Sequence, residues 1–170
     1  MSLWRRLLHG AEPPPGFAGT LDPDERVLAS AEAAGGAHVV VTSSGIWLPE
    51  GERLDWHLIS KATWAGGALT VLAAVETGTA GDAVLLADQP PRRLVLRDAG
   101  RVPEIVHTRV TGSIRSRHYR ELPGGGAWFV QRKVPGRDGV VLQVRADPGT
   151  DEATVQRLAA EVSRRMTGQQ

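Results

Sequence analysis

Hydrophobic and polar residues alternate, or gather in short β-branched runs, through most of the chain from residue 24 to residue 97. This period of two is interrupted every few residues by Gly, Pro, Ser or Asp, a pattern typical of short strands joined by tight turns. It predicts about seven strands, over residues 26–32, 37–42, 46–48, 53–63, 68–75, 83–87 and 92–97.

The hydrophobic spacing lengthens to three or four residues after position 100. Pro103 and Glu104 stand where the first turn of a helix favours them, and Gly112 is a plausible end. The pattern predicts one amphipathic helix, with a buried face formed by Val102, Ile105, Val106 and Val110.

Beyond residue 113 the period of two returns. It predicts three strands over 114–122, 127–134 and 140–146, which form a meander because Gly- and Pro-rich turns separate them. Thr150 is a plausible N-cap of a last helix that extends to about Arg165. We expect this helix to cover the apolar face of the three strands, since such a small sheet needs a packing partner.

Together these elements predict a mostly β fold of the α+β class. We expect an antiparallel barrel closed by one helix, followed by a three-stranded β-meander with a C-terminal helix. The expected organisation is a short helix and a Pro-rich connector over residues 1–16, a barrel domain over 17–113, and a β-β-β-α lobe over 114–170 packed on it.

Two segments carry a resemblance to a known fold. TSSGIW at residues 42–47, followed by DWHLISKATW at 55–64, resembles the pattern of bacterial PH-like (GRAM-like) domains, and the resemblance covers about residues 24–112. It implies a PH-like barrel closed by a helix.

The chain also resembles a family of uncharacterised actinobacterial proteins over nearly its whole length. GRVPEIVH at 100–107, RVTGSI at 109–114 and QRK at 131–133 carry this resemblance. It supports the fold and implies no particular activity.

Residues 45–64 contain three of the five tryptophans and form a predicted hairpin with a turn at 49–52. Read with a strand period, Trp56, Leu58 and Ser60 share one face, and Asp55, His57 and Ile59 share the other. The hairpin is therefore expected to be a barrel wall with Trp56 in the core.

The chain lacks cysteine, which excludes disulfides, thiolate zinc sites and cysteine nucleophiles. The five histidines show no metal-ligand spacing, and Ser43, Ser44, Asp55 and His57 match no nucleophile elbow. The glycines at 124–126 precede an apparent strand, so they predict a hairpin connection rather than a phosphate loop. The sequence predicts no catalytic, cofactor or metal site.

A net charge of +1 conceals two regions of opposite sign. Residues 17–100 hold six Arg/Lys and eleven Asp/Glu, whereas residues 101–146 hold nine and three. In the strand over 114–122, alternation puts Arg115, Arg117 and Tyr119 on one face and Arg120 on the other, and further cations come from the neighbouring hairpin. These cations form either a polyanion-binding face, or a solvated sheet face or a contact with the acidic region. The candidate residues for polyanion binding are Arg115, Arg117, Tyr119, Arg120, Arg132, Lys133 and Arg137.

We expect a non-catalytic binding or scaffolding module for a protein partner. One alternative is nucleic-acid or other polyanion binding through the basic face at 115–137, and a second is a small-molecule enzyme. Neither a signal peptide nor a membrane span is predicted, so a cytoplasmic location is expected. Residues 2–9 predict a short helix that docks on the protein or, through Trp4 and Leu7, on a membrane surface.

Overall fold

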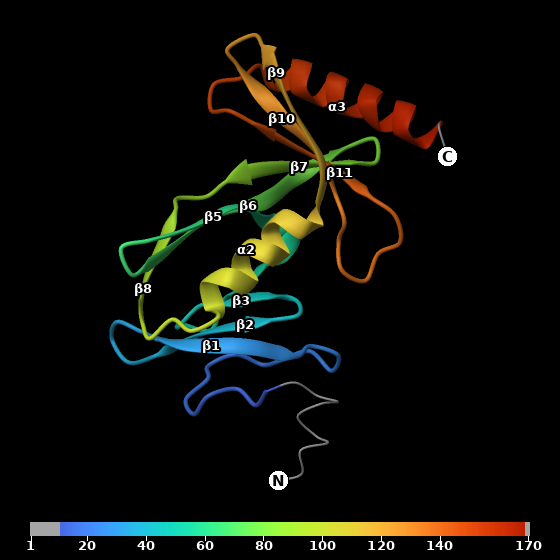
Figure 1. Cartoon of the computed structure of the whole chain (residues 1–170). Helices are drawn as coiled ribbons and strands as arrows, with labels where there is room; N and C mark the ends of the chain where they lie inside the picture. The colour runs from blue at the N-terminus through green and yellow to red at the C-terminus, as the bar shows by residue number, and fades with distance from the viewer. Residues whose placement is uncertain (1–10, 169–170) are drawn as a thin grey trace. The chain divides into compact units, whose positions relative to one another are not determined.

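Eleven strands and two α-helices account for most of residues 11–168, the part of the chain that the computed structural model describes (Figure 1). The helix expected over residues 2–9, with Trp4 and Leu7, lies outside these residues. The elements in chain order are β1 (Val27–Ala33), β2 (His38–Thr42), β3 (Gly45–Trp47), β4 (Arg53–Asp55), η1 (Trp56–Leu58), β5 (Ile59–Ala65), β6 (Ala68–Ala80), β7 (Ala83–Asp88), β8 (Arg92–Arg97), α2 (Val102–Ser113), β9 (Ile114–Leu122), β10 (Gly125–Arg132), β11 (Val141–Ala146) and α3 (Glu152–Thr167).

The chain divides into two compact units that are not contiguous in sequence. The first unit comprises residues up to Ala73 and Pro90–Thr111, and the second comprises Ala74–Gln89 and the residues from Gly112 onward. The hairpin of β6 and β7, expected in a barrel domain over 17–113, therefore belongs with the late strands. The cause is a parallel pairing that aligns Val144 of β11 with Leu85 of β7.

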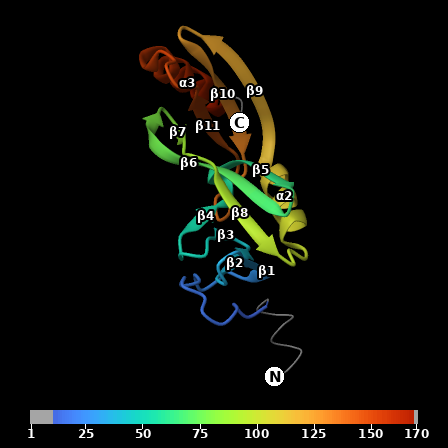
Figure 2. The ribbon, with the colours of Figure 1, turned by 90° about the vertical axis from the view of Figure 1, so that its left-hand side faces the viewer.

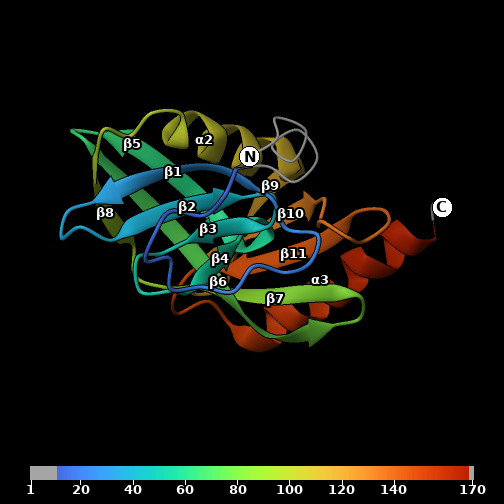
Figure 3. The ribbon, with the colours of Figure 1, turned by 90° about the horizontal axis from the view of Figure 1, so that it is seen from below.

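The first unit is an open antiparallel series of strands in the order β4-β3-β2-β1-β8-β6-β5. Figure 3 shows β1, β2 and β3 side by side. Among the described strands, β4 pairs only with β3 and β5 only with β6. The closed PH-like barrel predicted from the sequence is therefore wrong. After β4 the 3₁₀ turn η1 redirects the chain, and β5 pairs with β6 instead of joining the two ends of the series.

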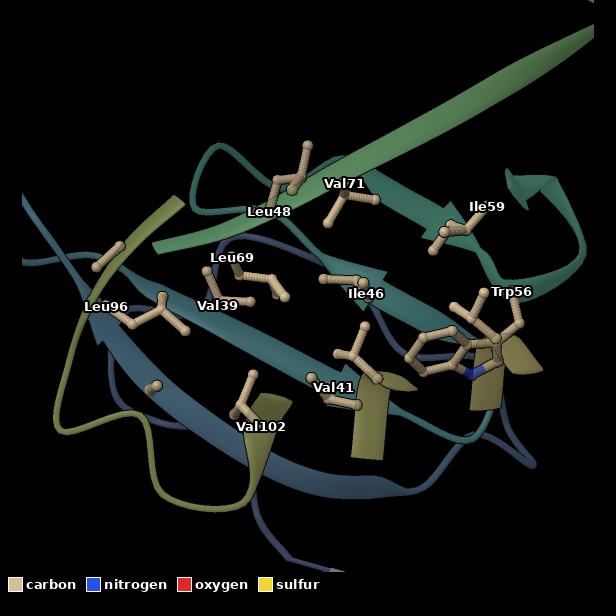
Figure 4. Close-up of a cluster of buried hydrophobic side chains, with 14 residues drawn as sticks. Val39, Val41, Ile46, Leu48, Trp56, Ile59, Leu69, Val71, Leu96 and Val102 are labelled. Carbon is tan, nitrogen blue, oxygen red and sulfur yellow. The ribbon is translucent and has the colours of Figure 1, made fainter. Parts of the chain in front are cut away.

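A core of aliphatic side chains around one tryptophan holds the first unit together (Figure 4). Trp56 is 2% exposed and its indole N–H donates to the Thr42 carbonyl at 3.0 Å, which confirms its prediction as a core residue. Helix α2 buries Val102, Val106 and Val110 in this core, as their spacing predicted. The prediction of one strand over 53–63 is wrong, because η1 breaks the alternation at residues 56–58.

The second unit is a mixed sheet in the order β6-β7-β11-β10-β9, where the segment of β6 from Ala74 onward takes part. Only the β7–β11 pair is parallel among its described strands. Helix α3 packs on one face, with Val155 and Ala159 against Phe129 and Val144, which confirms the expected cover (Figure 2). The helix is capped by Asp151 rather than Thr150, because the Asp151 carboxylate accepts the Thr154 N–H at 3.0 Å.

The described strands thus form an open, mixed sheet with two α-helices, which confirms a mostly β fold of the α+β class. None of the helices within residues 11–168 is both long and apolar enough to cross a membrane.

Candidate functional site

The face of the second sheet opposite α3 carries an aromatic pair. Since Phe129 packs under α3, its neighbour Trp128 points to the other face, where the strand register sets it beside Tyr119 of β9. The two ring centroids lie 5.2 Å apart with an interplanar angle of 56°. The Arg117 guanidinium lies 5.2 Å from the centroid of Trp128. Tyr119 is 43% exposed, so this aromatic cluster is open to solvent.

Two carboxylates border the aromatic pair. The Tyr119 hydroxyl donates to Asp147 at 2.5 Å, and this hydrogen bond raises the pKa of the phenol above its usual value. Arg145, opposite Trp128 in the register, lies 3.4 Å from Asp88. We call the group of Arg117, Tyr119, Trp128, Arg145 and Asp147 the Tyr119–Trp128 surface.

Burial raises the pKa of the Asp88 carboxyl, and the negative charge of Asp147 raises it further, while Arg145 opposes both. Each carboxylate at this surface is thus matched by a donor, Asp147 by the phenol of Tyr119 and Asp88 by the guanidinium of Arg145. The two carboxylates, Asp88 and Asp147, are accompanied by two guanidinium groups, those of Arg117 and Arg145, so the surface is electrically balanced rather than strongly basic.

Gly126 makes room for the tyrosine ring. It faces Glu121 across the β9–β10 pair, and a Cβ at this position would collide with the hydroxyl and ring of Tyr119. The hairpin itself is the connection that the glycines predicted, since β9 ends at Leu122 and β10 begins at Gly125. Gly124 takes a φ of +85°, which favours glycine at that turn.

The predicted basic residues do not form one patch. Arg117 and Tyr119 share a face as predicted, while Arg120 aligns with Ala127 on the face of α3. Arg115 falls at a β-bulge, because Gln131 pairs with Ser116 and Arg132 with Ile114, so the register gives it no partner.

Arg132 is buried rather than exposed. Its side chain donates to the Ser113 hydroxyl at 2.8 Å, and only 2% of the residue is accessible. Burial, with the nearby charge of Arg145, lowers the pKa of Arg132 to about 10. Lys133 and Arg137 are exposed, in the segment between β10 and β11. The structure therefore removes Arg132 from any surface cation cluster.

Sequence reasoning did not identify four residues at or beside this surface: Trp128, Arg145, Asp147 and Asp88. The turn at Pro123-Gly124, once recognised as a two-residue hairpin, fixes Trp128 opposite Tyr119, so this contact was accessible from the sequence. The contacts of Arg145 and Asp88 depend on the parallel β7–β11 pairing, which no local sequence pattern indicates.

A second polar cluster lies in the first unit, around the buried carboxylate of Glu25. This carboxylate accepts hydrogen bonds from the Thr42 hydroxyl at 2.5 Å, the Trp47 indole at 2.8 Å, the Asp22 N–H at 3.0 Å and Arg53 at 2.9 Å. Burial alone raises the pKa of Glu25, but these donors and the Arg53 charge outweigh it and lower the pKa. The cluster is internally satisfied, which indicates a role in stability.

The residues weighed for catalysis do not assemble into a site. Asp55 pairs with Arg53 at 2.7 Å, and the Ser43 hydroxyl accepts the Arg26 N–H at 2.9 Å. No group of three His, Asp or Glu side chains within residues 11–168 is arranged to hold a metal ion.

Each unit also has a shallow depression. One, of about 300 Å³, lies in the first unit and is lined by Leu28 of β1 with Arg101, Glu104, Ile105, Thr108 and Arg109. The other, of about 320 Å³, lies in the second unit beside Asp82 and Ser163, and the Asp82 N–H donates to the Ser163 hydroxyl at 2.9 Å. Neither brings together an acid and a base suited to proton transfer.

Comparisons of the chain with protein-family models, curated proteins and solved structures found no match. Function is therefore inferred from the geometry of these surfaces.

Proposed function

We propose that the protein is a non-catalytic binding module that contacts a protein partner through the Tyr119–Trp128 surface. The observation that carries this proposal is a Tyr–Trp pair with an exposed tyrosine, a half-buried tryptophan and an arginine against the tryptophan ring. Tyr, Trp and Arg are the residues most enriched where protein interfaces concentrate their binding energy.

The side chains at this surface are already held in place, which favours binding. The bond to Asp147 and the absence of a side chain at Gly126 fix the ring of Tyr119. Arg117 and Tyr119 both lie against the ring of Trp128. A partner that docks here loses little side-chain entropy on the protein's side, which lowers the cost of association.

A polyanion is the second candidate, supported by the exposure of Arg115, Arg120, Lys133 and Arg137. Three features weigh against a polyanion: the pairing of Arg145 with Asp88, the burial of Arg132, and the carboxylate of Asp147 beside Tyr119. These features favour a partner with mixed polar and apolar chemistry, as proteins have, over a phosphate backbone.

The test is affinity capture from lysate of the cells that produce the protein, with three baits: the wild type, Tyr119→Ala and Arg101→Ala. Arg101 is an exposed arginine next to α2 in the first unit and serves as the matched control. We expect a protein that the wild type and Arg101→Ala retain and that Tyr119→Ala loses.

Equal recovery by all three baits, or recovery no greater than with a mock bait, would contradict the proposal. Retention on heparin that falls with salt and with Arg115→Ala plus Arg120→Ala would favour the polyanion instead.

A further inference from the structure

Strand β9 is the last strand of its sheet, and only one of its edges is paired. Eight of its nine residues, all but Arg115, align with β10, and none of the other described strands lies along its outer edge (Figure 2). Such an edge presents a row of backbone donors and acceptors that a further strand can bind.

The contacts of Gly126 identify the outward-facing groups of β9. The Gly126 N–H donates to the Thr150 hydroxyl at 3.1 Å, and its carbonyl accepts the Asp147 N–H at 2.9 Å, so both point away from β9. Gly126 and Glu121 therefore form a non-hydrogen-bonded pair. Because antiparallel pairs alternate, the N–H and C=O groups of Glu121, Tyr119 and Arg117 point outward along the open edge.

The charge of β9 indicates which kind of strand can bind its open edge. β9 contains Arg115, Arg117 and Arg120 but only one acidic residue, Glu121. A second copy of β9, added as a strand, would place two strands side by side that each carry three arginines and one glutamate, and this excess of like charge disfavours their pairing. Glutamate or aspartate in an incoming strand would instead pair with these arginines.

We propose that the outer edge of β9 binds an extended, acidic segment of a protein partner, which adds one strand to the sheet. The inference rests on the proposed function and specifies the partner's chemistry: alternating side chains of the segment contact Tyr119 and Arg117 on one face and Arg120 on the other. The arginines thus discourage self-association and favour an acidic ligand.

The test uses the full chain and a fluorescein-labelled peptide of nine residues, the length of β9, in which glutamate and valine alternate. We expect saturable binding by fluorescence anisotropy. We also expect the backbone amides of Arg117, Tyr119 and Glu121 to exchange rapidly with deuterium in the free protein and to become protected with the peptide. The amides of His118 and Arg120 face β10 and are expected to be protected in both states.

Two controls separate strand addition from simple charge attraction. The same peptide with an N-methyl group on every backbone amide keeps its charge but has no N–H donor on either edge, so its affinity should fall by at least about tenfold. Arg117→Glu with Arg120→Glu should weaken binding of the acidic peptide by a similar factor and create binding of a lysine–valine peptide. Arg101→Glu is the matched control and should leave both affinities unchanged.

Binding without protection of the three outward amides would overturn the proposal, as would an absence of binding. Protection of these amides in the free protein, together with a dimer in sedimentation, would assign the edge to a second copy and also overturn it. A partner lost with Tyr119→Ala in the capture experiment, without peptide binding, would uphold the proposed function and reject only strand addition. Peptide binding with no captured partner would uphold strand addition and reject the proposed function.

Discussion

The two units contain similar polar chemistry in opposite surroundings. In the first, Arg53 lies 5.5 Å from the Trp47 ring centroid, and the Trp47 indole donates to Glu25. In the second, Arg117 lies 5.2 Å from Trp128, and its neighbour Tyr119 donates to Asp147. Trp47 is 8% exposed and Tyr119 is 43% exposed. Residue type alone therefore does not separate an internal structural cluster from a surface suited to recognition.

What covers each cluster explains the difference. Phe17 packs edge-on against Trp47 with ring centroids 5.3 Å apart, and Leu21 joins the same small core. The segment before β1 therefore closes over Trp47 and buries the Glu25 carboxylate. Tyr119 belongs to an edge strand and keeps much of its ring exposed, so its contacts can be shared with a partner.

The largest expected effect comes from removing the two aromatic side chains in turn. Trp47→Ala should lower the free energy of unfolding by about 3–5 kcal/mol, because it leaves a cavity and deprives Glu25 of a donor. Tyr119→Ala should cost under about 1 kcal/mol, as the side chain is exposed. Guanidinium unfolding of both variants measures the contrast, and similar losses would invalidate the comparison.

A smaller effect is expected from Glu25→Gln, about 3 kcal/mol, since the amide cannot accept all four donors or balance Arg53. The folded pKa of Glu25 is lowered, so its contribution to stability is present above the usual pKa of 4.5 and is lost as pH falls through the lowered value. Thermal unfolding measured from neutral pH down to pH about 3 should therefore decline less steeply in Glu25→Gln than in the wild type.

Parallel pH profiles for Glu25→Gln and the wild type would show that the carboxylate is not held as described. Asp24→Asn provides a control, because Asp24 is an exposed neighbour in sequence.

The smallest effect is a shift in the titration of Tyr119, which sharpens the description of the exposed cluster. The protein has one tyrosine, so an alkaline absorbance titration reports this phenol alone. Its pKa should lie above 10.0 because of the hydrogen bond to Asp147, with added effects of burial and of the charges of Asp147 and Glu121. Asp147→Asn should move the titration midpoint of Tyr119 down towards 10. The control variant Asp82→Asn should leave this midpoint unchanged. An unchanged midpoint in Asp147→Asn would argue against the hydrogen bond in solution.

Local periodicity was a sufficient guide to most elements. The strands over residues 37–42, 114–122 and 140–146 and the helices α2 and α3 lie close to their predicted positions, because each buries one face. The same reasoning failed at residues 56–58, where a 3₁₀ turn carries Trp56 into the core without strand alternation.

Contacts between distant segments were beyond such reasoning. Glu25 meets Thr42, Trp47 and Arg53 only after three strands have taken their register, and no short motif marks a buried carboxylate. The open sheet and the parallel β7–β11 pair likewise follow from tertiary register. In the candidate site, Arg117 and Tyr119 were recognised from alternation, whereas the burial of Arg132 was not foreseen.

The parallel pairing of β7 with β11 has a consequence for synthesis of the chain. Val84 of β7 pairs with Gln143 of β11, which lies much later in the sequence. The β6–β7 hairpin therefore leaves the ribosome well before its partner strand. Until then the edge of β7 that later binds β11 is open in the nascent chain, as are the alanines that α3 finally covers. Translation must therefore reach α3 before the second unit can close.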